Sequence, residues 1–342
     1  SQILVVKSGQ GVYHKAFGHH SYDQRSPVKL TDLYDLASLT KIAATTLAAM
    51  EMYDKEKIHL DDPLAAYFKN RRVKVYPREM VADTLVRDTL LPSPAEIMED
   101  SSLVMRSQAP TSPFMKTAQF ATEEDRKEAD EKPDSVMRGN TAAAIAPAAR
   151  NTGQGVWINE SPLFRPTIAD LLIHKSGLPA AMPILPYLNY RDSLTGRFDR
   201  YYQETPDSLF SIQVADHFYL RKDYRDSLWQ STKRLRVYRK DYEYSDVNMV
   251  LVQQAIDSIN RMPINLFLDS IFYRPLGLAT MRFNPRKTLD KDRLIPTEVD
   301  RWRGQLLQGF VHDPTAALLG GISGNAGLFS NANDLAILFQ MI

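Results

Sequence analysis

The chain opens with two apolar runs of strand length on either side of a short polar turn. The two runs are residues 3–7 and 11–17. The turn that joins them, residues 8–11, contains Gly9 and Gly11. Glycine adopts the positive φ angles that tight turns need, so the sequence predicts a β-hairpin. No charged and apolar leader precedes the first run, so no signal peptide is recognised in the chain.

From Ser38 to about Tyr53 the pattern changes to that of a helix. Apolar residues recur three and four positions apart, as they do on one side of a helix. These residues are Leu39, Ile42, Ala43, Leu47 and Met50. Asp35 precedes the run and is a candidate N-cap for the predicted helix.

Several later segments also have helical spacing. Residues 166–178 begin with Thr167, a capping residue, and contain Gly177, which is placed to end a helix. The other segments predicted to contain helices are residues 206–231, 242–259, 262–272 and 333–342. Residues 287–314 are predicted to be mostly loop.

Residues 99–159 differ in character from the rest. They include a charge run, residues 123–134, and few aromatic or branched apolar residues. Such a composition cannot bury much apolar surface, so we predict a flexible insertion in one partial domain that spans residues 1–342. The predicted division of that domain is a hairpin region (1–37), a helical region (38–98 and 160–286) and a return toward the sheet (287–342).

Composition excludes several classes of protein. Of the 342 residues, 44% are hydrophobic and 24% charged, which is ordinary for a globular protein. The net charge of +1 offers no electrostatic footprint for nucleic acid, and no apolar run reaches the length of a membrane span. The absence of cysteine excludes thiolate catalysis and cysteine-bound metals. His19 and His20 lack the spacing of a zinc motif, and no metal or other cofactor is predicted.

The predicted helix at Ser38 begins with a serine and a lysine three residues apart. Positions i and i+3 are neighbours on a helix surface, so Ser38 and Lys41 should project side by side. A serine needs a base to become a nucleophile, and Ser-x-x-Lys is one such pair. Residues 26–29 also fit the spacing but lie in a polar run. From local spacing alone, ordinary first-turn residues remain an equal interpretation for Ser38 and Lys41.

A second proton carrier is needed, and Tyr244 stands at the mouth of a predicted helix. A nearby ammonium favours the ionised form of a tyrosine, so Tyr244 is a candidate base. Taken alone, a tyrosine at such a position is more often half-buried with one hydrogen bond. His174 and His312 are interpreted as structural histidines. Ser323 lacks the last glycine of a Gly-x-Ser-x-Gly elbow, because Asn325 occupies that place.

Five motifs in order resemble one family of proteins. They are Ser38-Leu-Thr-Lys41, Leu60-Asp-Asp-Pro63, Asp170-Leu-Leu-Ile-His-Lys-Ser-Gly-Leu178, Tyr244-Ser-Asp246 and Gly324-Asn-Ala-Gly-Leu-Phe-Ser330. The chain resembles the β-lactamase-related serine hydrolases, which include class C β-lactamases, D-alanyl-D-alanine carboxypeptidases and esterases. The resemblance is greatest to the branch fused to family 3 glycosidase domains. It implies an α/β (α+β) fold, with an antiparallel sheet flanked by helices beside a helical subdomain.

The resemblance also implies roles for residues of these motifs. Ser38 would be the acylated nucleophile, Lys41 its activating base and Tyr244 the proton shuttle. Asp246 stands where most of the family has asparagine, and it can pair with Lys41 and make that lysine a worse base. Asn325 and Gly327 belong to the family's glycine loop and would support the site or bind substrate. A periplasmic or other extracytoplasmic location is implied as well.

One family motif is not found. A Lys-Thr-Gly or His-x-Gly segment normally follows the glycine loop and supplies a second oxyanion amide beside that of Ser38. Its absence suggests a chain cut at both ends that lacks the C-terminal strands. The expected reaction is hydrolysis of an ester, an amide or a D-amino peptide bond. The alternative is a catalytically impaired module that binds a peptide or glycan and partners a glycosidase domain.

Overall fold

The computed structural model describes residues 1–68, 73–75, 156–158, 161–184, 201–237 and 241–342. The chain divides into two units, residues 1–73 with 157–342 and residues 74–156. The insertion predicted for residues 99–159 lies almost entirely outside the described residues. Strands β4 (Val73–Val75) and β5 (Val156–Ile158) form a two-stranded sheet. The following paragraphs concern the first unit.

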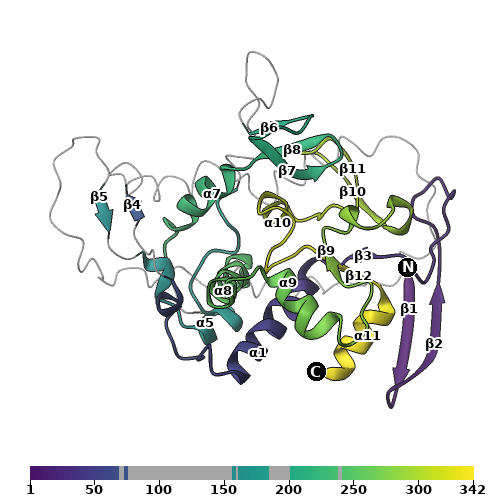
Figure 1. Ribbon diagram of the computed structural model, residues 1–342, viewed down its shortest axis with the longest axis horizontal. Helices are drawn as coiled ribbons and strands as arrows, with labels where there is room; N and C mark the ends of the chain where they lie inside the picture. Colours follow the sequence, from purple (N-terminus) through teal and green to yellow (C-terminus); the bar gives the residue numbers. More distant parts are fainter. Residues whose placement is uncertain (69–72, 76–155, 159–160, 185–200, 238–240) are drawn as a thin grey trace, which may run out of the picture. The chain divides into compact units, whose positions relative to one another are not determined.

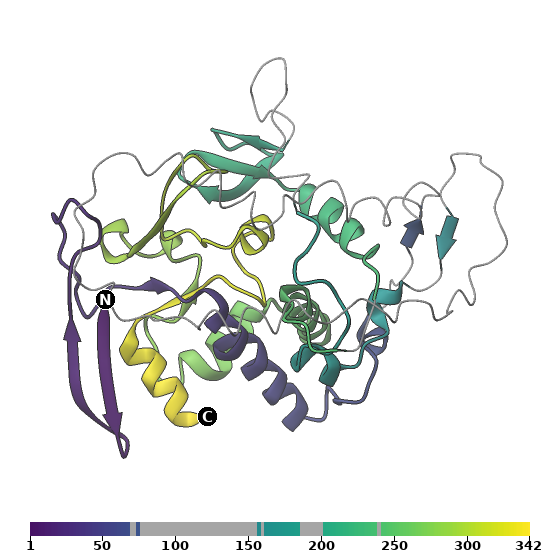
Figure 2. The ribbon, with the colours of Figure 1, turned by 180° about the vertical axis from the view of Figure 1, so that it is seen from behind.

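The predicted N-terminal hairpin is confirmed. Strands β1 (Gln2–Lys7) and β2 (Gln10–Ala16) pair antiparallel, and Ser8 and Gly9 both have positive φ in the turn between them. Two consecutive positive φ angles match the right-handed twist of the paired strands. β1 also contacts the C-terminal helix α11 (Ala332–Met341), as both ribbon views show (Figures 1 and 2).

The helix predicted from Ser38 is present, but it does not begin as a regular α-helix. A 3₁₀ turn (Ala37–Leu39) leads into a π-helical stretch (Lys41–Thr46) and then into α1 (Leu47–Asp54). The prediction that Asp35 is its N-cap is wrong, because the N-cap position belongs to Leu36. The Asp35 carboxylate instead accepts the Ala37 N–H at 2.9 Å and holds the turn just before Ser38.

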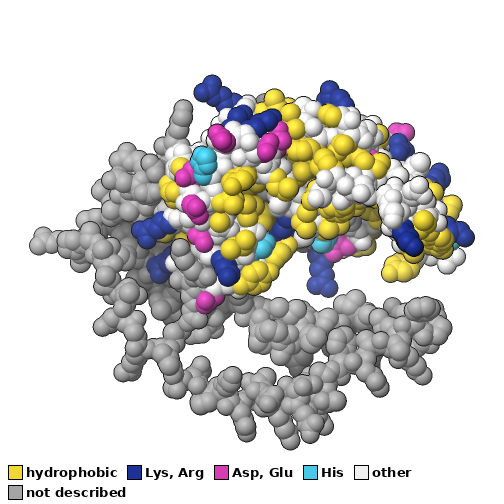
Figure 3. All heavy atoms as spheres, turned by 90° about the horizontal axis from the view of Figure 1, so that it is seen from below, with side chains coloured by type: hydrophobic (Ala, Val, Ile, Leu, Met, Phe, Trp, Pro, Cys, Tyr) yellow, Lys and Arg dark blue, Asp and Glu magenta, His cyan; other side chains and the backbone are white. Residues whose placement is uncertain are grey.

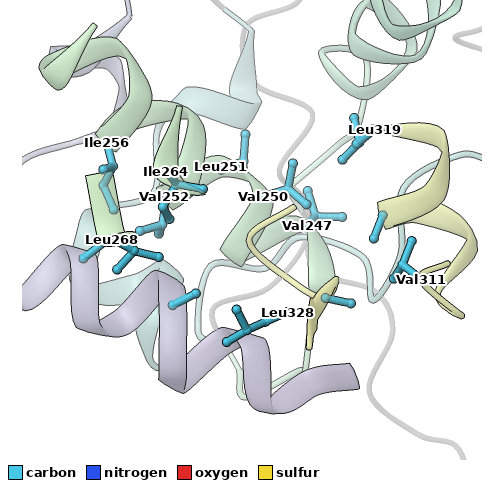
Figure 4. Close-up of a cluster of buried hydrophobic side chains, with 14 of the residues drawn as sticks. Val247, Val250, Leu251, Val252, Ile256, Ile264, Leu268, Val311, Leu319 and Leu328 are labelled. Atoms are coloured by element: carbon cyan, nitrogen blue, oxygen red, sulfur yellow. The ribbon is translucent and has the colours of Figure 1, made fainter. Parts of the chain in front are cut away.

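The core is arranged around α8 (Asp246–Asn260), in which nine of the ten residues from Val247 to Ile256 are buried. Figure 4 shows side chains of α8 packed against those of α9 (Ile264–Leu268) and of the C-terminal segments. α8 contacts α1 on one side and α5 (Ile168–Leu172) on another. The N-terminus of α8 is thereby fixed in the interior, close to the start of the Ser38 helix.

A three-stranded antiparallel sheet joins the two ends of the chain. β12 (Leu328–Ser330) lies between β3 (Tyr34–Asp35) and β9 (Arg282–Phe283), with Phe329 opposite both Asp35 and Arg282. β3 ends just before Ser38, and β12 begins just after the glycine loop. The pairing therefore brings the glycine loop alongside the Ser38 turn.

Two secondary-structure predictions are wrong. Residues 206–231 are not one helix, because β7 (Phe210–Ala215) and β8 (Phe218–Arg221) form a hairpin before α7 (Tyr224–Thr232). Residues 287–314 are not mostly loop, since β10 (Pro296–Asp300) pairs with β11 (Gln305–Gln308). In both cases each strand pairs with its neighbour in the chain, and that pairing outweighs local preference. The remaining elements are β6 (Tyr202–Gln203) and α10 (Pro314–Leu318).

The helix predicted over residues 166–178 is shorter than expected. Thr167 caps α5 as predicted, with a reciprocal hydrogen-bond pair to Asp170. The helix ends at Leu172, however, and the residue with positive φ that terminates it is His174 and not Gly177. This difference places a histidine at a position that usually holds glycine.

One face of the described chain is rich in apolar side chains. Figure 3 shows them from below, and a shallow depression on the described surface is lined by residues of α1 and the C-terminus, including Met50, Tyr53 and Met341. Among the helices that the structure describes, none has the length and apolar character needed to span a bilayer.

Candidate active site

Ser38 and Lys41 lie side by side, as their spacing predicted. The Lys41 ammonium donates to the Ser38 hydroxyl oxygen over 2.8 Å. Ser38 is exposed in the 3₁₀ turn, whereas Lys41 is only 4% exposed. The serine is therefore open to a ligand while the lysine beside it is shielded from water.

Among the described residues, Lys41 has three oxygen partners. Besides Ser38, its Nζ donates to the Asn325 carbonyl oxygen at 3.2 Å and lies 2.6 Å from Asp246 Oδ1. An ammonium carries three protons, so three acceptors match the charged form of the lysine. In this arrangement Lys41 holds the Ser38 oxygen as an acceptor, and it must release a proton before it can take one.

The glycine loop reaches Lys41 through close backbone contacts. Gly324 offers its carbonyl to the Thr45 hydroxyl at 2.7 Å and its N–H to the Gln253 side chain at 2.7 Å. A Cβ on Gly324 would collide with the Met249 carbonyl oxygen, and Gly327 has a φ of +110°. Only glycine fits such positions without displacing the backbone, and the loop thereby presents the Asn325 carbonyl to Lys41.

The side chain of Asn325 does not contact Lys41. Its amide nitrogen donates to Asp313 Oδ1 at 3.0 Å, and its amide oxygen accepts from the Ser323 hydroxyl. Asp313 also caps α10 by accepting the Ala316 N–H at 2.7 Å. The side chain therefore anchors the loop, while the backbone oxygen of the same residue faces the site.

Tyr244 covers the other side of Lys41. The Lys41 Nζ lies 4.8 Å from the centre of the Tyr244 ring, which is a cation–π distance. Tyr244 is about half exposed, and within the part of the chain that the structure describes its hydroxyl has no hydrogen-bond partner. The hydroxyl is thus available to a bound molecule.

His174 lies against Tyr244, with the two ring centres 4.6 Å apart. Burial lowers the pKa of His174 from its ordinary value and the Lys41 ammonium lowers it further, while Asp246 acts in the opposite direction. The imidazole is therefore held neutral beside the charged pair. The sequence interpretation of His174 as only structural did not anticipate this contact.

Asp35 connects the Ser38 turn to the loop before α10. Its Oδ1 accepts the Ala37 N–H and its Oδ2 accepts the His312 N–H at 2.7 Å. Burial raises the pKa of Asp35, and the two N–H donors oppose that rise. Ala37 has a positive φ of 45°, a conformation that costs energy for alanine, and the Asp35 bond helps to hold it.

Within the described residues, no group of three or more histidine and acidic side chains is arranged to hold a metal ion. The chemistry available at the site is that of a hydroxyl, an amine, a carboxylate and a phenol.

The comparisons with known proteins agree on one family. The family model described as "Beta-lactamase" matches residues 1–84. A protein of Escherichia coli K12 named "Putative D-alanyl-D-alanine carboxypeptidase" is 26% identical over 358 aligned positions, which cover 99% of this chain and 58% of that protein. By both comparisons the chain is similar to β-lactamase-related proteins.

Solved structures support the fold. A β-lactamase/D-alanine carboxypeptidase from Yersinia pestis aligns with a TM-score of 0.50 and 16% identity, covering 99% of this chain and 61% of that one. A penicillin binding protein from Bacillus halodurans gives 0.51 and 11%, with 99% and 67% covered. The predicted fold class, helices with antiparallel sheet, is confirmed. The chain spans about 58% of the length of the first curated relative it matches.

The residues that the sequence singled out are brought together in part. Ser38, Lys41, Tyr244 and Asp246 surround one ammonium, and Asn325 joins them through its carbonyl. Gly327 does not touch the ammonium and instead shapes the loop. The sequence interpretation missed the side chains that lie behind this group, His174 and Asp35. The histidine in the third of the five motifs was the available signal for the first of these.

Proposed function

We propose that the protein is a serine hydrolase whose reaction acylates Ser38 and then releases the acyl group to water. The observation that carries this proposal is the 2.8 Å contact between an exposed serine hydroxyl and a buried lysine amine. An exposed hydroxyl contributes little to holding a buried lysine in the fold. A base that activates a nucleophile, in contrast, must lie within hydrogen-bond distance of a hydroxyl that the substrate can reach.

The three partners of Lys41 suggest how the proton moves. We propose that a proton passes from the Lys41 ammonium to Asp246, 2.6 Å away, which leaves a neutral amine. That amine takes the Ser38 hydroxyl proton as the serine oxygen attacks the carbonyl carbon of the substrate. The bond to the leaving group then breaks, and the Tyr244 hydroxyl, which faces open space, hands a proton to that group. Water reverses the steps to release the acyl product.

The proposed substrate is a peptide that ends in D-alanine. The curated relative is named "Putative D-alanyl-D-alanine carboxypeptidase", and the site offers the Lys41 ammonium and the hydroxyls of Ser38 and Tyr244. Peptides of that kind belong to bacterial cell walls, so we further propose an extracytoplasmic location. A partner glycosidase domain in the same protein is part of the proposal.

The test is the intact mass of the full-length gene product after incubation with a fluorophosphonate and, separately, with a penicillin. We expect each probe to add one adduct, and the Ser38→Ala variant to add none. A peptide ending in D-Ala-D-Ala should release D-alanine with the wild-type protein only. Release from esters but not from the peptide would move the substrate class to esters.

Ser26→Ala is the matched control, because residues 26–29 have the same Ser-x-x-Lys spacing outside the site. This variant should react like the wild-type protein. A folded wild-type protein that forms no adduct with either probe would overturn the proposed function and favour a binding module.

A further inference from the structure

His174 occupies a backbone position that histidine rarely takes. It has a φ of +58° and follows the last turn of α5. The Lys175 N–H bonds the Asp170 carbonyl at 2.8 Å, and the His174 N–H bonds the Leu171 carbonyl at 3.3 Å. This pair of bonds is the Schellman motif, in which the left-handed residue is usually glycine. A side chain that is kept at such a strained position is expected to serve another purpose.

The ring of His174 receives two hydrogen bonds at the same nitrogen. The Ser245 N–H and the Asn248 side-chain amide each lie 3.2 Å from Nδ1. The Asn248 amide is oriented by the Ser176 hydroxyl, which donates to its oxygen at 2.7 Å. A backbone N–H can only donate, so Nδ1 carries a lone pair and the proton of the neutral ring is on Nε2.

The backbone of His174 also holds the segment that carries Tyr244. The Glu243 N–H donates to the His174 carbonyl at 2.9 Å, and the Ser245 N–H donates to the ring. The residues on both sides of Tyr244 are thus bonded to one histidine, whose ring packs on the Tyr244 ring at 4.6 Å. The Ser245 hydroxyl and the Asp246 N–H also bond the carbonyls of Pro179 and Ala180, so His174 is one of the groups that set the position of Tyr244.

Protonation of the imidazole would reverse these contacts. A proton on Nδ1 would face two donors and break both bonds, which would free the Ser245 backbone. The titratable groups packed around the ring are Lys41, Asp246, Tyr244 and Tyr242, the last with its ring centre 6.2 Å away. Lys41 repels a second cation here, and Asp246 attracts it. Burial and Lys41 together lower the pKa of His174, so the neutral ring persists to mildly acid pH.

We propose that His174 is a positioning residue that fixes Tyr244 while its ring is neutral, and that protonation of the ring breaks its bond to the Ser245 N–H, shifts Tyr244 and slows acylation of Ser38 in acid. The inference rests on the proposed hydrolase function. The inference attributes the fall of the acylation rate at low pH, the acid limb of the rate–pH profile, to His174, which does not touch the substrate.

The test compares two substitutions with the wild-type protein. His174→Asn keeps an acceptor oxygen near the Nδ1 position, tolerates positive φ and cannot titrate. His174→Ala removes the acceptor. Acylation rates are measured by mass between about pH 5 and pH 9. We expect His174→Asn to stay within about threefold of wild type above neutral pH and to lose most of the acid limb, and His174→Ala to fall about tenfold or more throughout.

His217→Asn is the matched control, since His217 also has a positive φ (52°) but lies in the exposed turn between β7 and β8. Its profile should follow the wild type. An unchanged acid limb in His174→Asn would overturn the proposal, even if His174→Ala fails to fold.

A second readout does not depend on activity. Nitrogen-15 NMR of the full-length protein should show the His174 ring at neutral pH with its proton on Nε2 and a hydrogen-bonded Nδ1. A proton on Nδ1 would overturn the inference and leave the proposed function intact. Failure of the wild-type protein to react with any probe would instead refute the proposed function, and the NMR result would still stand by itself.

Discussion

Two buried cations, Lys41 and Arg303, each pair with a carboxylate in this protein, and they differ in their other partners. Arg303 bonds Asp300 through Nε (2.9 Å) and Nη2 (2.6 Å), and its remaining donors go to the carbonyls of Val214, Val311 and His312. Every partner of Arg303 is a fixed part of the fold. Lys41 also pairs with a carboxylate and a carbonyl, but its third partner is the exposed Ser38 hydroxyl.

The difference separates a structural ion pair from a reactive one. The Arg303 guanidinium cannot lose its proton in a protein, so it can only join the β10–β11 turn to the segments around it. A lysine amine can change its protonation state when its surroundings change, and one of its partners is free to react. The same elementary contact therefore supports the fold in one place and a reaction in the other.

The largest expected effect is on the rate of Ser38 acylation, and it distinguishes Lys41 from a purely structural cation. Lys41→Met removes the amine and keeps similar volume, so we expect acylation of Ser38 to fall by about a thousandfold or more. The melting temperature should change little, because Asp246 is partly open to water and keeps some hydration. Adduct formation followed by mass, beside a thermal melt, tests both expectations.

Lys55→Met is the control for this substitution. Lys55 lies just after α1 and pairs with Glu51 at the surface, so its loss should leave acylation unchanged. A large loss of stability in Lys41→Met without loss of acylation in the folded protein would place Lys41 in the same class as Arg303.

A second effect should appear when each carboxylate loses its charge. Asp300→Asn leaves a buried guanidinium without its counter-charge, and we expect the free energy of unfolding to fall by about 3 kcal/mol. Asp246→Asn should cost about 1 kcal/mol or less, because Lys41 can release its proton and avoid a buried unpaired charge. Urea unfolding of the two variants at neutral pH measures both values. Equal costs would show that the two pairs do not differ in the way described.

The third effect concerns a buried carboxyl with no close cation. Burial raises the pKa of Asp257 to about 7, against weaker opposing effects of the Gln253 amide, the Ile264 N–H and Arg225. The folded protein then binds this proton more tightly than the unfolded chain, so the stabilisation is complete in acid and is lost as the pH rises through about 7.

Asp257→Asn removes that dependence. We expect the variant to gain roughly 2 kcal/mol relative to the wild type between mildly acid pH and about pH 8. Urea unfolding across this range measures the difference, and the exposed Asp226→Asn is the control that should show none. A constant difference between Asp257→Asn and wild type at all pH values would contradict the expectation.

Local pattern was a good guide where an element is set by its own residues. The hairpin at residues 2–16, the Thr167 cap and the helix from residue 246 follow from turn glycines, a capping hydroxyl and apolar spacing. Residues 210–221 were predicted as helix and are strands, because their conformation depends on a partner strand. The local sequence predicts only a structural role for His174, because nothing in it indicates which ring lies against the imidazole.

The sequence by itself determined that Ser38 and Lys41 meet, since a three-residue separation at a helix start brings two side chains together whatever surrounds them. It also carries the glycines at 324 and 327, which the close backbone contacts of the loop require, and the five motifs that resemble the β-lactamase-related serine hydrolases. Only the tertiary structure decided which other oxygens contact the Lys41 ammonium. Asn325 is 284 residues from it in sequence, and Asp246 approaches it from a different helix. Contacts of that range depend on how α8 and β12 pack in the core, which no local spacing encodes.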